Sequence, residues 1–257
     1  AYNRITQFGA LSLVKSFRLR NLHLLDLEMN RVGENKSNSF PDGTAVPELK
    51  ILNLRKNQIG DDVLINWVQS GGFERLDHLN LGWNKISDEG AKVLANSPTL
   101  KPLRTLILDS NHIGDSGSLR LAQSKNLTNL INLNMADNNF KSNGESALLD
   151  LRTRNLVEKL TADKSLNLNV LYLRNKDIKA LSLYQKLQEV ISLSLRNNLF
   201  NHQGLGDLAT SPFVKNIKNL NLMDNSIGDK GVFLLSESKS MTKLQVLNLE
   251  NTGVSST

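Results

Sequence analysis

A short string of leucines closed by an asparagine recurs along this chain, and it limits the possible folds more than any other feature. Residues 76–86 read LDHLNLGWNKI, or LxxLxLxxNxI, where x is any residue. Nine copies are recognisable, with their asparagine positions at Asn30, Asn57, Asn84, Asn111, Asn138, Lys176, Asn198, Asn225 and Thr252. Counting back 27 residues from Asn30 reaches Asn3, so the chain is expected to begin inside a tenth, truncated repeat. Self-similarity at a fixed period is typical of solenoids, in which units stack in one direction.

The second half of each repeat has the spacing of a helix. A glycine follows most asparagine positions by six residues and opens an apolar string such as GAKVLA at 90–95. Apolar residues three and four positions apart predict an amphipathic helix. Asp88, Asp115 and Asp229 lie two residues before such a glycine, and we expect their carboxylates to cap the helices that begin there. Each repeat is thus predicted to be a strand, a turn and a helix.

The repeat is irregular in two places. In this alignment the asparagine positions are 27 residues apart, except for one pair of intervals of 38 and 22 residues. The stretch 145–189 is therefore irregular, and residues 145–160 can form one extended helix there. This irregularity is either drift in a helix of the convex side or a bend that reshapes the concave face. The stretch 33–48 is polar, contains two prolines and is predicted to be a loop.

One such unit cannot bury its own leucines, but stacked units can. The predicted fold class is therefore α/β: a curved solenoid, or horseshoe, with a parallel sheet on the concave side and helices on the convex side. We expect a single domain over residues 1–257. Each turn asparagine is expected to be buried with its amide bonded to the backbone, and the turns at Lys176 and Thr252 are expected to be looser. Trp67, in an apolar helical string, is assigned to the core.

The string LxxLxLxxNxI resembles that of leucine-rich-repeat proteins. The 27-residue period and the GxxxLA helices are similar to those of the ribonuclease-inhibitor-like subfamily, which includes inhibitors, innate immune receptors, Ran GTPase-activating proteins and effectors of intracellular bacteria. The chain has no cysteine and is rich in Asn and Lys, which looks more like a bacterial effector. The resemblance implies a non-enzymatic scaffold for protein–protein interaction, located in the cytoplasm or secreted by a bacterium into the host cytosol. Two alternatives stay open: a regulator of a small GTPase, as the Ran activators are, and the substrate-recognition part of a larger enzyme.

The composition and the motifs of the chain argue against several other classes of protein. The absence of cysteine excludes a disulfide scaffold, a cysteine-ligated zinc site and a cysteine nucleophile. No apolar run reaches the length of a membrane span, and no signal peptide is recognisable. The start at Ala1 rather than Met suggests a piece of a longer chain. The four histidines lie in well-separated repeats, and no catalytic or phosphate-binding string occurs. We therefore expect no enzymatic activity, no metal and no cofactor.

The candidate binding residues are those predicted to be exposed on the concave face. Basic and acidic residues are equally frequent there, seven of each, which suits a protein partner better than nucleic acid. We expect the protein itself to be a monomer. The candidate partner-binding residues are Arg55, Lys56, Trp83, Asp109, Tyr172, Arg174 and Arg196.

Two groups stand out among these residues. Trp83 beside Arg55 and Lys56 has the composition of an interface hot spot, unless the ring lies flat on neighbouring side chains. Arg174 and Arg196 are placed at the same position of adjacent repeats, near Tyr172, where a guanidinium pair can hold a carboxylate or phosphate. The alternative is that both arginines are simply solvated.

Overall fold

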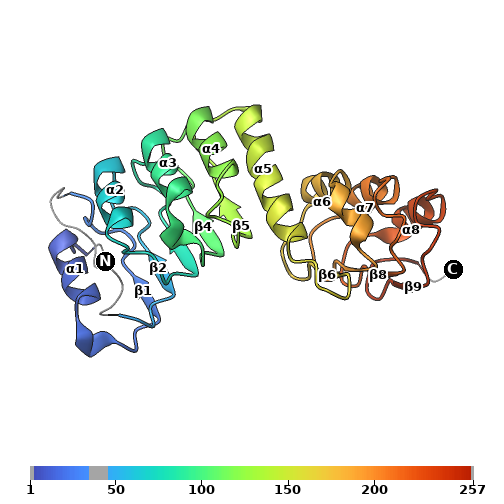
Figure 1. The fold of residues 1–257 in the computed structure, drawn as a ribbon, viewed down its shortest axis with the longest axis horizontal. Helices are drawn as coiled ribbons and strands as arrows, with labels where there is room; N and C mark the ends of the chain where they lie inside the picture. Colours follow the sequence, from blue (N-terminus) through green and yellow to red (C-terminus); the bar gives the residue numbers. More distant parts are fainter. Residues whose placement is uncertain (1–2, 35–45, 256–257) are drawn as a thin grey trace. The chain divides into compact units, whose positions relative to one another are not determined.

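The computed structural model describes residues 3–34 and 46–255. The chain divides into two compact units, Ala1–Arg152 and Thr153–Thr257 (unit 1 and unit 2). Both are built from the same strand, turn and helix (Figure 1). The expected single domain over 1–257 stays a prediction.

Unit 1 contains one parallel sheet in the order of the sequence. Each strand residue pairs with the residue 27 positions further on, so the register repeats the period of the sequence. The strands are β1 (Leu24–Asp26), β2 (Ile51–Asn53), β3 (His78–Asn80), β4 (Thr105–Ile107) and β5 (Asn132–Asn134). The helices are α1 (Gln7–Val14), α2 (Asp61–Gln69), α3 (Asp88–Asn96) and α4 (Asp115–Ala122), with short 3-10 helices at Phe17–Leu19 and Pro98–Leu100. The longer α5 (Ser142–Val157) includes the end of unit 1.

The core of unit 1 lies between the strands and the helices. The central leucines of β1 to β4 are buried, while the residues on either side of them are exposed or half-buried. Helices α2 to α4 lie along one side of the sheet (Figure 1), and the fully buried Trp67 of α2 packs edge-on against Phe73 with ring centroids 6.3 Å apart. Neighbouring strands are about 4.8 Å apart, whereas packed helices need about 10 Å. The stack therefore curves with its helices outside, as the predicted α/β solenoid requires.

The turn asparagines link successive repeats and are buried as predicted, except Asn138, which is half-buried. The Oδ1 atom of Asn84 accepts hydrogen bonds from the backbone N–H groups of Asn57 and Ile59 in the preceding repeat, both at 3.0 Å. Its Nδ2 atom donates to the carbonyls of Leu54 and Leu81 at 3.0 and 2.9 Å. Equivalent bonds are made by Asn111, Asn198 and Asn225. A buried polar side chain is thus paired completely by the backbone of two repeats.

The aspartates at the helix starts do not cap their own helices, so that prediction is wrong. The Oδ1 atom of Asp88, the first residue of α3, accepts hydrogen bonds from the N–H groups of Gly114 and Gly117 at 2.6 and 2.9 Å. Those groups belong to the start of α4, one repeat later. The side chain of Ser87 caps α3 instead. Because the helices stack in register, a carboxylate in the first turn of one helix reaches the unpaired N–H groups of the next.

Unit 2 repeats the same architecture with a second parallel sheet, again with a 27-residue register. Its strands are β6 (Ser165–Asn167), β7 (Ser192–Ser194), β8 (Asn219–Asn221) and β9 (Val246–Asn248). Its helices are α6 (Asn175–Ser182), α7 (His202–Ala209) and α8 (Gly228–Ser236), with a 3-10 helix at Gln185–Glu189.

The frame predicted for the first repeat of unit 2 is wrong by five residues. Leu166 pairs with Leu193 in the sheet, and the Oδ1 atom of Asn198 accepts from the N–H groups of Leu171 and Leu173 at 3.1 and 3.0 Å. Leu171, not Lys176, therefore occupies the asparagine position.

The two irregular intervals are consequently 33 and 27 residues. All six additional residues precede β6, and α5, with 16 residues, is the predicted extended helix. The sequence misleads because Leu168, Leu171 and Leu173 reproduce the leucine spacing of the repeat out of frame.

The other irregular stretch, 33–48, falls largely on residues 35–45, which lie outside the described residues. Val46 and Leu49, which follow, are buried in the core of unit 1. In the part of the chain that the structure describes, no helix is long and apolar enough to cross a membrane.

Candidate functional site

Four residues of unit 1 occupy one turn position in successive repeats: Glu28, Arg55, Gly82 and Asp109. The Nη1 atom of Arg55 donates to both carboxylate oxygens of Asp109 at 2.9 Å, and its Nε atom lies 3.7 Å from Oε1 of Glu28. Arg55 reaches across a whole repeat because Gly82 has no side chain. A Cβ atom at residue 82 would lie 2.6 Å from Nη1 of Arg55. One guanidinium thus connects carboxylates that are three repeats apart.

Trp83 lies beside this arginine and remains accessible. Its ring centroid is 5.6 Å from Cζ of Arg55 and 4.6 Å from Nζ of Lys56, which are cation–π distances. Half of the residue, 51%, is exposed. The backbone of Trp83 is left-handed, with a φ of 54°, as it is at Lys56, one repeat earlier. Arg55, Lys56, Trp83 and Asp109 therefore lie together, as predicted, and are called here the Trp83 cluster. Both cations lie over the ring of Trp83, which is the contact that the alternative interpretation expected, and a partner-binding role for the cluster stays a prediction.

The charges of the Trp83 cluster are already paired within the protein, with one exception. Asp109 is only 7% exposed, so it depends on Arg55 to balance its charge. Arg55 is paired with both Asp109 and Glu28. Lys56 forms no ion pair with any residue in 3–34 or 46–255, and its ammonium group lies over the ring of Trp83 instead. The accessible groups of the cluster are consequently an indole and an ammonium.

Arg174 and Arg196, the second group of candidate residues, do not lie at the equivalent positions predicted for them. Arg174 is the residue before α6, and its backbone N–H donates to Asp177. Arg196 follows β7, and its Nε atom donates to Oδ2 of Asp224 at 3.1 Å. The residue one repeat before Arg196 is Asn169, whose Oδ1 atom accepts from the N–H of Arg196. The two arginines therefore do not occupy the same repeat position, and the five-residue error in the frame explains the wrong prediction.

Tyr172 was expected on a strand beside these arginines. It lies instead in the turn that follows β6, with a φ of 54°, and 64% of it is exposed. The residue one repeat later is Leu199, which is also exposed. A partner-binding role for Tyr172, Arg174 and Arg196 stays a prediction.

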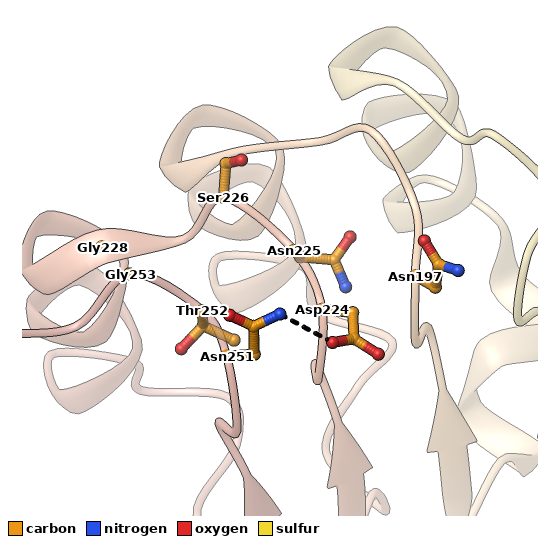
Figure 2. Close-up of a pocket in the computed structure, with 8 residues that line it drawn as sticks. All are labelled: Asn197, Asp224, Asn225, Ser226, Gly228, Asn251, Thr252 and Gly253. Atoms are coloured by element: carbon orange, nitrogen blue, oxygen red, sulfur yellow. Dashed lines mark hydrogen bonds between the residues drawn. The ribbon is translucent and has the colours of Figure 1, made fainter.

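Unit 2 contains an open pocket of about 740 Å³ at the turns after its strands. Figure 2 shows Asp224 between Asn251 and Asn197, which come from three successive repeats. The Nδ2 atom of Asn251 donates to Oδ1 of Asp224 at 2.9 Å. This hydrogen bond, followed by that from Arg196, lowers the pKa of Asp224, so the pocket keeps an ionised carboxylate. The remaining lining residues are Asn225, Ser226, Gly228, Thr252 and Gly253.

Unit 1 has a hollow of about 410 Å³ at the equivalent turns of its first repeats. Its lining is basic rather than acidic: Asn3, Arg4, Met29, Asn30, Arg31, Lys56 and Gln58. Arg4 and Arg31 were not among the predicted binding residues. The signal was present, because each of these arginines directly follows an asparagine of the repeat.

The histidines do not gather into a site. Within 3–34 and 46–255, no group of three or more His, Asp or Glu side chains is arranged to hold a metal ion. His78 lies on β3, where burial lowers its pKa from the usual 6.5.

A family model described as "Leucine Rich repeat" matches residues 48–62, 76–95, 99–122 and 215–236. The matched segments are leucine-rich repeats. The matched segments lie in both units, and each contains strand or helix residues of the repeats described above. No curated protein sequence matches this chain significantly.

Several solved structures are similar to this chain at low sequence identity. They include the plant peptide hormone receptor RGFR1 in complex with RGF2, at 17% identity and a TM-score of 0.36, covering 93% of this chain and 34% of the receptor. The Arabidopsis receptor kinase HAESA ectodomain with a peptide hormone ligand is 18% identical, with a TM-score of 0.35 and coverages of 94% and 38%. An internalin, inlF, from Listeria monocytogenes is 19% identical, with a TM-score of 0.33 and coverages of 95% and 71%. The chain thus spans little more than a third of the two receptors.

Proposed function

We propose that this chain is a non-enzymatic scaffold that binds a protein partner through the Trp83 cluster on its strand side. The observation that carries the proposal is a half-exposed indole held in place by Arg55 and Lys56. Tryptophan and arginine are the residue types that contribute most to interface hot spots. An aromatic side chain that is already fixed loses little conformational entropy when a partner covers it.

The chemistry of the cluster favours protein over other ligands. Glu28 and Asp109 lie within a few ångströms of Arg55, so the surface carries both signs of charge. Mixed charge around an aromatic anchor suits a protein surface of complementary potential. A nucleic-acid site would instead need a continuous basic stripe with several aromatic side chains.

The finer assignment is also a proposal. A 27-residue repeat with a helix in nearly every unit supports membership of the ribonuclease-inhibitor-like subfamily. The absence of cysteine and the many Asn and Lys residues support a bacterial effector that acts, as a monomer, in the cytosol of a host cell.

The direct test is capture of a partner from host-type cell lysate with the wild-type chain and with Trp83→Ala. We expect the captured protein to bind Trp83→Ala about 2 kcal/mol more weakly or worse, which is about 30-fold in affinity. The melting temperature should change little, because the ring is half-exposed.

Phe233→Ala is the matched control for this experiment. Phe233 is an aromatic residue on α8 with 63% exposure, outside the cluster. Its replacement should leave the affinity unchanged. Equal affinity of wild type and Trp83→Ala would place the interface elsewhere.

A further inference from the structure

The basic hollow of unit 1 is built by backbone that the repeats fix. The N–H of Ile5 donates to Oδ1 of Asn30, and the N–H of Arg31 donates to the carbonyl of Ile5, both at 2.9 Å. These bonds hold the two chain segments that carry Arg4 and Arg31 side by side. Lys56 enters from the next repeat, where its left-handed backbone turns it out of the strand. Cationic residues from three successive repeats therefore line the hollow, and the ammonium group of Lys56 lies over the ring of Trp83.

The hollow has more positive than negative charge. Arg31 lies 3.5 Å from Glu34, which also accepts a hydrogen bond from Gln58 at 3.2 Å. Across residues 3–34 and 46–255, neither Arg4 nor Lys56 has a carboxylate partner. Counted over the described residues, the three cationic lining residues and Glu34 give a formal charge of +2. This excess of positive charge attracts an anionic ligand.

We infer that this hollow binds the carboxylates of an acidic segment in a protein partner. The inference rests on the proposed function and deepens it by naming the chemistry of part of the partner. A volume of about 410 Å³ holds a few side chains rather than a folded element. Arginine presents paired donors that match the geometry of a carboxylate. Lys56 is shared with the Trp83 cluster, so an acidic segment in the hollow continues directly into that surface.

Unit 2 provides an internal comparison. Its pocket lies at the same turns of the repeat but is lined by Asp224 and asparagines, with no basic residue. The positive charge of the unit 1 hollow is therefore a property of its particular side chains and not of the fold. None of the described residues that line the hollow is aromatic, so these residues give bases no ring to stack on, which favours a peptide over a nucleic acid.

The test uses a fluorescein-labelled hexaglutamate peptide and the whole chain, followed by fluorescence anisotropy at low ionic strength. Arg4→Gln combined with Arg31→Gln should weaken the affinity about tenfold or more. The control, Arg18→Gln with Arg120→Gln, removes the same net charge from exposed positions outside the hollow and should change the affinity little. Circular dichroism spectra and melting temperatures of both variants establish that they remain folded.

Three results would overturn the inference. The first is no binding of hexaglutamate by the wild-type chain. The second is an equal loss of affinity in the control, which would indicate attraction to net charge alone. The third is tighter binding of a single-stranded oligonucleotide that depends on the same two arginines.

The inference about the hollow and the proposed function can each be contradicted while the other holds. Trp83→Ala removes no charge from the hollow, so hexaglutamate affinity should persist in that variant. If hexaglutamate does not bind but capture of a protein depends on Trp83, only the inference about the hollow is contradicted. Hexaglutamate binding without Trp83-dependent capture would remove only the role of the Trp83 cluster.

Discussion

At the scale of single residues, the missing side chain of Gly82 matters as much as the side chains around it. Gly82 leaves the space through which Arg55 reaches Asp109, and both carboxylate oxygens of Asp109 are satisfied by that one guanidinium group. Trp83, the next residue, then lies against Arg55. The arrangement depends on three repeats having different residues at one position. A strictly regular repeat could not produce it.

His78 yields a prediction about pH. Burial lowers its pKa, so the folded protein resists a proton that the unfolded chain accepts below about pH 6.5. The stability that the neutral ring contributes is complete above this pH and is lost as the pH falls through the folded-state pKa. We expect His78→Gln to lose less stability than wild type between about pH 7.5 and pH 5, measured by urea unfolding. His23→Gln, at the exposed position directly before β1, is the control, and identical pH profiles for wild type and His78→Gln would contradict the prediction.

At the scale of elements, the helices are joined through their first turns. Asp88 of α3 caps α4, and Asn175 of α6 makes the same contacts with α7, where its Oδ1 atom accepts from the N–H groups of Asn201 and Gly204 at 3.0 and 3.3 Å. An amide oxygen can therefore replace the carboxylate in this role. The contact adds a polar link between helices that otherwise meet through apolar side chains.

Substitution of Asp88 tests this link. Asp88→Ala should lower the free energy of unfolding by about 1 kcal/mol, because the N–H groups of Gly114 and Gly117 lose their acceptor. Asp88→Asn should retain most of that stability, since Asn175 shows that an amide fits. Both are measured by urea unfolding, with Glu89→Ala as the control because Glu89 pairs with Lys92 in its own helix. A drop in Glu89→Ala equal to that in Asp88→Ala would mean that general first-turn charge matters, not the contact between helices.

At the scale of the whole molecule, the contacts described above join each repeat to its neighbours in the stack. The strands form two sheets, one in each unit, and every turn asparagine bonds only to its own and the preceding repeat in the contacts described above. Stability of such a stack is approximately a sum over units and their interfaces. A local defect should therefore have a local effect.

Asn111→Ala is the corresponding experiment. Asn111 is 4% exposed and bonds to the backbone of two repeats, so its loss should cost about 1–3 kcal/mol. Hydrogen exchange should become faster in β3, β4 and β5 and stay unchanged in β7, β8 and β9. Uniform acceleration across both units would show that the chain unfolds as one cooperative body.

Much of the fold was predictable because the repeat spacing determines which residues face inward. The nine predicted copies correspond to nine strands in the described residues, and the buried turn asparagines, the long helix and the Trp83 cluster were all expected. A strand of period two and a helix of period 3.6 leave distinct patterns of leucine in a sequence. Once the period is known, residues one period apart are expected to lie side by side in adjacent repeats. This is how Trp83 could be placed beside Lys56.

The spacing of the leucines specifies the repeating unit, its period and the face on which each regular residue lies. The three-dimensional structure sets the frame at Leu171, because hydrogen bonding to the next strand chooses between two sets of leucines with the same spacing. It also decided that Asp88 caps the neighbouring helix, that Arg55 crosses a repeat to Asp109, and that Arg4, Arg31 and Lys56 share a hollow. The physical reason is the same in each case. Periodicity encodes a position along one repeat, whereas side-chain reach and backbone pairing depend on distances between repeats.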